Sequence, residues 1–169
     1  MKNKPTFKFF IFLTSILFLF LAQNNVNAQE NEIYEVSDYS LKKKISKKND
    51  KARFYDLALK KHPTLYINNG GLKSNSESIK PLKIDLLGYK SFNGFINGNY
   101  DKENVELIIL TLDNRADLNN SLDVSNNNDF KKLKYILVKC NFNCTNEDIL
   151  KFVKVNSKVR VFYKYDLPQ

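Results

Sequence analysis

The sequence predicts a small α/β domain in which most strands are parallel. Four apolar runs of strand length, rich in aliphatic and aromatic residues, occupy residues 79–89, 105–113, 133–141 and 159–166. Three connections join them, over residues 90–104, 114–132 and 142–158. Each connection is longer than the roughly 12 residues that a parallel crossover needs. The third is expected to be helical, because Thr145 can cap the apolar segment that follows it.

The first 28 residues are expected to be a signal peptide and not part of this domain. Lysines precede an apolar run from Phe9 to Ala22, which is shorter than the roughly 20 residues of a membrane-spanning helix. Val26 and Ala28 stand at the positions that a signal peptidase reads, so cleavage is expected after Ala28. The alternative is an uncleaved anchor. Cleavage predicts a periplasmic or extracellular protein with no transmembrane segment after its signal peptide.

Residues 29–48 are predicted to form a loosely ordered charged arm, acidic in its first half and basic in its second. Five lysines of the basic half are a candidate contact for an anionic surface: Lys42, Lys43, Lys44, Lys47 and Lys48. A solvated arm is the alternative. The formal charge of +9 falls to +6 without the signal peptide, which carries three lysines and no acid. Export argues against nucleic acid as the partner, so a protein or an envelope polymer is expected.

Residues 49–169 are expected to form the single α/β domain. The segment "NDKARFYDLALKKHP" predicts a short helix, because Phe54, Leu57 and Ala58 share one face and Pro63 ends it. A strand is expected over residues 64–67. The Asn and Gly residues at 68–71 tolerate positive φ and predict a turn.

The four apolar runs also have a nearly constant spacing. Their first large aliphatic residues are 26, 28 and 26 residues apart: Ile79, Val105, Leu133 and Val159. The first three runs carry large apolar residues at positions 1, 4 and 6, and Asn141 stands at position 9 of the third. The fourth run departs from this pattern, because Lys164 stands at its position 6.

This pattern resembles a degenerate leucine-rich repeat, over residues 79–166 at most. The resemblance implies a solenoid-like α/β fold. An ordinary α/β sandwich with strands at this spacing is the alternative.

Two of the connections are rich in Asn, and the first also in Gly, which makes them candidate contact surfaces. They are the segments 91–104 and 114–130. The aromatic residues Phe92, Phe95 and Tyr100 of the first segment are expected to cover the edge of the core. A binding patch made by these rings is the alternative.

Cys140 lies at the end of the third apolar run, and Cys144 precedes the helix predicted in the third connection. A structural disulfide between them is the main expectation, because export leads to an oxidising compartment. Buried free thiols are a second interpretation. Thiol redox chemistry is a third, since the arrangement resembles thioredoxin-like proteins, although few residues follow Cys144 for the rest of such a fold. A zinc site would need four ligands, and His62 is the only histidine.

No other set of residues points to catalysis. The sequence contains no phosphate-binding loop and no nucleophile elbow. We therefore expect no catalytic residue, metal or cofactor, and an exported non-enzymatic interaction or structural protein. The alternative is a thiol-dependent redox protein of the cell envelope that uses Cys140 and Cys144.

The cleavage site gives a first prediction. Because the site ends at Ala28, the mature N-terminus should be Gln29. N-terminal sequencing of exported material checks this. Chains that keep Met1 in a membrane fraction would show instead that the apolar run is an anchor.

Overall fold

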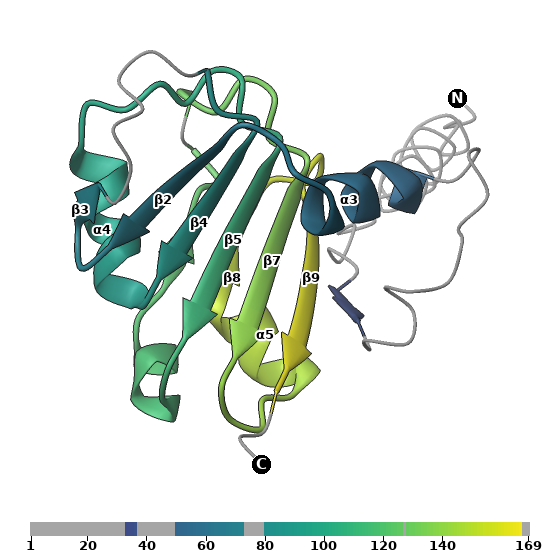
Figure 1. Cartoon of the computed structure of the whole chain (residues 1–169). Helices are drawn as coiled ribbons and strands as arrows, with labels where there is room; N and C mark the ends of the chain where they lie inside the picture. Colours follow the sequence, from purple (N-terminus) through teal and green to yellow (C-terminus); the bar gives the residue numbers. More distant parts are fainter. Residues whose placement is uncertain (1–32, 37–49, 73–79, 127, 167–169) are drawn as a thin grey trace, which may run out of the picture. The chain divides into compact units, whose positions relative to one another are not determined.

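A seven-stranded sheet with helices on both faces forms the centre of the structure, a computed structural model (Figure 1). The structure describes residues 33–36, 50–72, 80–126 and 128–166, all within the compact unit Asn31–Gln169. The elements are β1 (Ile33–Glu35), α3 (Asp50–Leu59), β2 (Thr64–Asn68), β3 (Gly71–Leu72), β4 (Lys83–Leu87), α4 (Tyr89–Asn97), β5 (Leu107–Leu112), the 3-10 helix η1 (Arg115–Asn119), β6 (Leu122–Asp123), β7 (Tyr135–Cys140), α5 (Asn146–Phe152), β8 (Val153–Lys154) and β9 (Arg160–Tyr165). The predicted α/β class with mostly parallel strands is confirmed.

The strands follow one another across the sheet almost in chain order. The spatial order is β1-β9-β7-β5-β4-β2-β3, and every pair is parallel except β2 with β3. The parallel strands β2, β4, β5, β7 and β9 advance in one direction across the sheet, and only β3 turns back to the outer side of β2. Right-handed crossovers that all advance the same way lie on the same face of the sheet.

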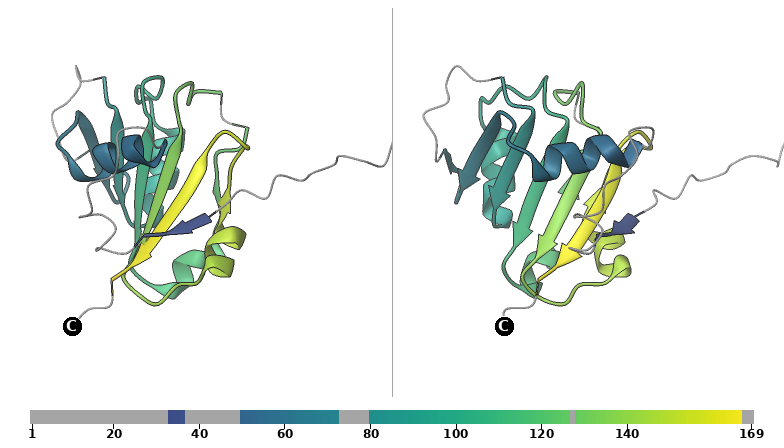
Figure 2. Two further views of the ribbon diagram at one scale, coloured as in Figure 1. Left: turned by 90° about the vertical axis from the view of Figure 1, so that its right-hand side faces the viewer. Right: turned by 45° about the vertical axis from the view of Figure 1, so that its right-hand side comes forward.

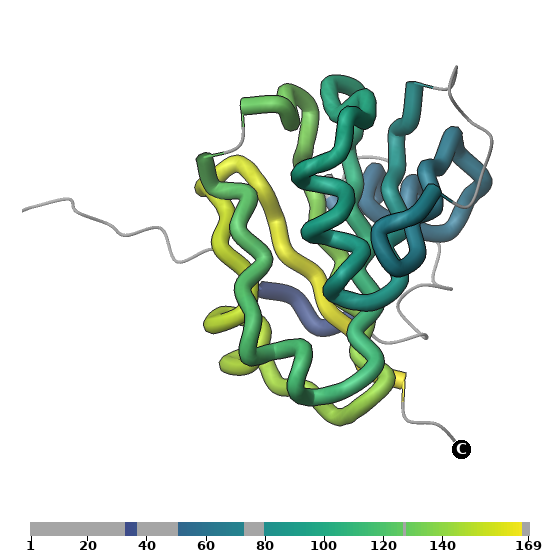
Figure 3. The backbone as a smooth tube through the Cα atoms, turned by 90° about the vertical axis from the view of Figure 1, so that its left-hand side faces the viewer, coloured from purple at the N-terminus to yellow at the C-terminus, as the bar shows by residue number. Residues whose placement is uncertain are grey.

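The connections accordingly pack on one face, and α3 packs on the other (Figures 2 and 3). The first face forms a core with Phe92 and Phe95 of α4 and with Ile149 and Phe152 of α5. A two-stranded sheet of β6 and β8 lies within these connections. The second face forms a smaller core against α3, so the central strands are buried on both sides.

Helix α3 is held on the sheet by aromatic stacking and by two cations. Phe54 lies parallel to Phe162 of β9, with ring centroids 3.7 Å apart. Arg53 donates a 2.6 Å hydrogen bond to Glu106, which precedes β5. Lys83 is buried beneath the helix and donates to the carbonyl of Leu57 at 3.1 Å. A cation at this end stabilises the helix dipole, although burial lowers the pKa of Lys83.

The predicted turn at residues 68–71 is a tight hairpin between β2 and β3. Asn69 and Gly70 have φ values of 51° and 78°. Positive φ at both central residues is the hairpin geometry that an Asn-Gly pair favours.

The spacing of the apolar runs, 26, 28 and 26 residues, equals the offset between paired strands in one case and differs from it in two. Ile108 pairs with Ile136, 28 residues later, as expected. Ile84 pairs with Ile108 at an offset of 24, however, and Ile136 pairs with Val161 at an offset of 25. The offset between β7 and β9 is thus one residue shorter than the spacing of the runs. A one-residue change of register exchanges the two faces of a strand. Val161 and Tyr163 therefore face the larger core, in place of Phe162 and Lys164. The leucine-rich-repeat resemblance stays a prediction.

Two further expectations differ from the structure. The first connection contains helix α4, which its Gly and Asn content did not indicate. The helix forms because burial of Phe92 and Phe95 outweighs the weak helix propensity of Gly and Asn.

Within the predicted arm, Ile33–Glu35 forms β1 and pairs with β9, so these residues belong to the sheet. Val36 is buried in the core beside α3. The remaining residues of the arm, including its five lysines, lie outside the described residues, as does the predicted signal peptide. None of the helices in the described ranges has both the length and the apolar character needed to span a bilayer.

The packing of α3 gives a second prediction. Phe54→Ala removes a fully buried ring and should lower the free energy of unfolding by about 3 to 5 kcal/mol. Leu59→Ala on the same helix is the control. That side chain is 52% exposed, so the loss should stay below about 0.5 kcal/mol. Chemical denaturation of both variants measures the difference, and equal losses would contradict the assigned packing.

Candidate functional site

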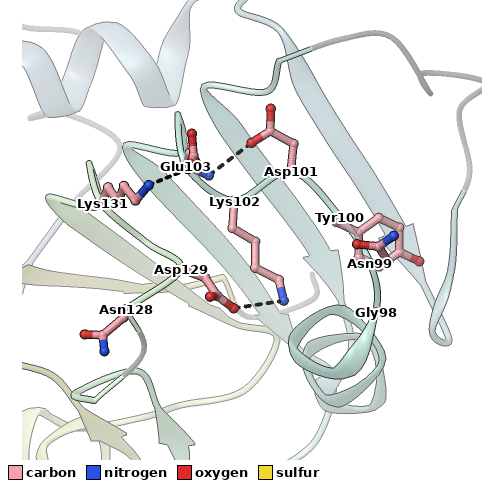
Figure 4. A pocket seen from close by; sticks show the side chains of 9 residues that line it. All are labelled: Gly98, Asn99, Tyr100, Asp101, Lys102, Glu103, Asn128, Asp129 and Lys131. Atoms are coloured by element: carbon pink, nitrogen blue, oxygen red, sulfur yellow. Dashed lines mark hydrogen bonds and ion pairs between the residues drawn. The ribbon is translucent and has the colours of Figure 1, made fainter.

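A polar cavity of about 400 Å³ lies at the edge of the sheet where the parallel strands begin (Figure 4). Its walls come from two loops. Residues 98–103 lead from α4 into β5, and residues 128–131 lead into β7. These are parts of the two connections that the sequence marks as candidate contact surfaces. The structure therefore brings those two segments together, which the sequence analysis did not predict.

The pairing of β5 with β7 places the two loops side by side. The 28-residue offset of this pair continues into the loops through hydrogen bonds between side chains. Lys132 donates to Asn104 at 2.8 Å, and Lys131 donates to Glu103. Lys134 extends the series by donating to Glu106 at 3.1 Å. Three successive side-chain contacts thus join the segment before β5 to the segment before β7, next to the cavity.

Lys102 closes the inner wall of the cavity. Its side chain is only 7% exposed, and its ammonium group donates to the Ile96 carbonyl at 2.8 Å. Asp129 lies 3.7 Å from the same group, across the cavity from the first loop (Figure 4). The cation also stands 5.4 Å from the centroid of the Phe95 ring. A buried ammonium group requires such partners, so Lys102 ties the helix, the loop and the opposite wall together.

Tyr100 forms an aromatic part of the wall. Its ring stacks on Phe95 with centroids 5.7 Å apart. Gly98 lets the ring come close, because an added Cβ there would lie 2.3 Å from a Tyr100 ring carbon. Phe92 and Phe95 are buried in the core, as expected. Tyr100 also packs on that core, and in addition it lines the cavity.

The paired side chains Glu103 and Lys131 are poorly suited to proton transfer. The hydrogen bond from Lys131 lowers the pKa of Glu103, and the same bond raises the pKa of Lys131. Both shifts move the groups away from neutral pH, whereas a general acid or base works best with a pKa near the operating pH. The arrangement supplies fixed hydrogen-bond donors and acceptors, which suits binding of a polar ligand.

Cys140 and Cys144 lie at the opposite edge of the sheet, where the strands end. Both are free and buried, with exposed fractions of 1% and 2%. The interaction between the two thiols raises the pKa of Cys140 and lowers that of Cys144. Burial further raises the pKa of Cys140. Both cysteines are free thiols in the structure, so the disulfide stays a prediction.

Arg115 clamps the loop that carries the two cysteines. It donates to the Asn143 carbonyl at 2.8 Å and to Asp148 at 3.0 Å. Asp148 accepts a hydrogen bond from the Thr145 backbone and donates its own N–H to the Thr145 hydroxyl, which forms the predicted helix cap. The loop is therefore held in place by polar contacts that do not need a covalent bond.

The remaining chemical candidates are not gathered into a site. His62 lies beside α3, 3.1 Å from the Asp56 carbonyl and 3.2 Å from the Asp56 carboxylate. It lies just after the end of α3 and before the start of β2, where it serves a structural role. The two cysteines lie at the opposite edge of the sheet, where the strands end. Over the described residues, no group of three or more His, Cys, Asp or Glu side chains could hold a metal ion.

No family model, curated protein sequence or solved structure matches the chain.

The cysteine pair gives a third prediction. If the disulfide forms, exported protein should show no free thiol after denaturation, whereas reduced protein should show two. Native reduced protein should react slowly with maleimide, because both sulfurs are buried. Replacing both cysteines by serine should cost about 1 to 2 kcal/mol, since the loop they close is short.

The redox alternative predicts a different result on the same sample. A catalytic bridge should equilibrate with glutathione at about −200 mV, well above the roughly −300 mV typical of structural bridges. That result would overturn the structural interpretation and make Cys140 and Cys144 the reactive residues.

Proposed function

We propose that the protein is an exported, non-enzymatic interaction protein that binds its partner through the cavity at the amino edge of the sheet. The observation that carries this proposal is the meeting of the two polar loops in one cavity. Binding surfaces are commonly built from loops that a rigid scaffold positions. The paired strands β5 and β7 provide such a scaffold directly beneath both loops.

The electrostatics of the cavity supports binding over catalysis. Glu103 and Lys131 form an ion pair, and the hydrogen bond between them lowers the pKa of the acid and raises that of the base. Lys102 is fixed by its carbonyl and carboxylate partners. Such groups are preorganised to form hydrogen bonds, and no proton needs to move for them to do so.

A solenoid-like arrangement is part of the proposal. It is supported by the one-way strand order and by the in-register contacts between residues 28 positions apart. Asn141, at position 9 of the third run, donates to Asp113, at position 9 of the second, at 3.0 Å. A hydrogen bond between equivalent positions is what a degenerate leucine-rich repeat would produce.

The thiol-dependent alternative is favoured by one observation, the lowered pKa of Cys144. It is opposed by burial, because a redox thiol must be reached by its partner. The thiol measurements described above separate the two functions.

Site-specific photocrosslinking tests the proposed binding site. A photoreactive amino acid at Asn128, an exposed cavity residue, should form adducts with the partner in the producing cells. The matched control is Asn146, which is exposed at the start of α5, at the opposite edge of the sheet. We expect adducts from Asn128 and none from Asn146. Equal yields from the two positions, or no adduct from either, would contradict the proposal.

A further inference from the structure

A second cavity, of about 220 Å³, adjoins the first along the same edge of the sheet. Its lining includes Phe130 and Leu133 from the loop before β7, and Lys158 and Val159 from the turn before β9. Both cavities are lined by Asn128 and Lys131, so they share a wall. Together they follow the starts of β5, β7 and β9, which are neighbours in the sheet. Neighbouring strands are about 4.8 Å apart, so the starts of the three strands span roughly 10 Å, and the two adjoining cavities form a site longer than either one alone.

From this geometry we infer that the ligand is a neutral glycan chain, a hydroxyl-rich polymer that lies across both cavities. The inference rests on the proposed function and names the class of partner for the same site.

The charges of the site favour an uncharged ligand. Lys131 is already paired with Glu103, and Lys102 with Asp129. Asp101 of the first cavity and Lys158 of the second add one charge of each sign, so across both cavities three acids balance three lysines and neither sign is in excess. A polyanion or polycation would have to compete with the existing ion pairs, whereas a neutral ligand leaves them intact.

The hydrogen-bonding groups match hydroxyls. Asn99 and Asn128 are exposed cavity residues, and each amide side chain carries two donor hydrogens and an acceptor oxygen. A sugar hydroxyl also donates and accepts, so it can satisfy either end of an amide. Tyr100 adds a ring held in place by Phe95 and Gly98, with an apolar body and a polar tip. A sugar ring has apolar C–H faces, which can pack on such a ring, and hydroxyl groups at its edge, which can bond to the amides.

An extended peptide fits the edge less well. Peptides that bind to sheets usually add a strand along a sheet edge through main-chain hydrogen bonds. The cavities instead cross the starts of strands whose backbone N–H groups are already bonded. Glu106 donates to Leu82 at 2.9 Å, Lys134 to Glu106 at 3.0 Å and Arg160 to Lys134 at 2.9 Å. The contacts available to a ligand therefore come mainly from side chains.

Titration calorimetry with defined sugars tests the inference on the purified protein. The probes are cellohexaose, chitohexaose, maltohexaose and laminarihexaose, with the matching disaccharides and a galacturonic acid hexamer as comparisons. We expect at least one neutral hexasaccharide to bind, and to bind more tightly than its disaccharide because the site is elongated. Its affinity should change less than about twofold between roughly 0.1 and 0.5 M NaCl, since screening affects only charged partners.

Two variants and a control locate the binding. Asn128→Ala removes an exposed amide and should weaken binding about three- to tenfold, the effect of one lost hydrogen bond. Gly98→Ala should also weaken binding, because the new Cβ displaces the Tyr100 ring. Asn146→Ala at the other edge should leave affinity within about twofold of the unchanged protein. Asn128→Ala carries the test if Gly98→Ala fails to fold.

The outcomes separate this inference from the proposed function. No binding of any neutral hexasaccharide would overturn the inference, as would salt-sensitive binding of the galacturonic acid hexamer alone. Protein adducts from Asn128 combined with no sugar binding would leave the binding site in place and identify a protein partner instead. Sugar binding that Asn146→Ala weakens as much as Asn128→Ala would place the glycan elsewhere and also overturn the inference.

Discussion

The pairing of β5 with β7 is the constraint on which the rest of the structure depends. Both strands are buried on their two faces, so their register is fixed by packing on each side. The same offset continues beyond the strands at both ends. At the amino edge it joins Lys131 to Glu103, and at the carboxyl edge it joins Asn141 to Asp113. One register therefore positions the cavity loops and the start of the loop that holds the cysteines.

The sequence predicted those features that depend on local patterns. The length and apolar content of the runs located the strands, and Thr145 with Asp148 located the start of α5. The tight turn at Asn69 and Gly70 follows from residues that tolerate positive φ. These features depend on a few neighbouring residues, so they can be recognised without knowledge of the rest of the fold.

Features that depend on contacts between distant segments were not predictable in this way. Helix α4 is rich in Gly and Asn, and its stability comes from rings that insert into the core of the sheet. The pattern of β9 does not show which face it turns to the larger core, because apolar residues occupy the adjacent positions Val161 and Phe162. The cavity joins residues about 30 positions apart, and only the β5–β7 register shows that they meet. One sequence signal could have indicated this meeting. Acidic residues before β5 are followed by lysines 28 positions later, as in Glu103 and Lys131.

The first and last strands of the domain are neighbours, and this affects the order in which the sheet can form. Tyr34 pairs with Phe162, and the Val36 backbone donates to Tyr163 at 2.8 Å. A chain that emerges amino end first therefore carries β1 without its partner until almost the whole chain has emerged. Strands β2 to β7 can pair with their neighbours as they appear, whereas the β1 edge must wait for β9. Completion of the sheet thus requires that β9 has emerged, although β1 emerges first.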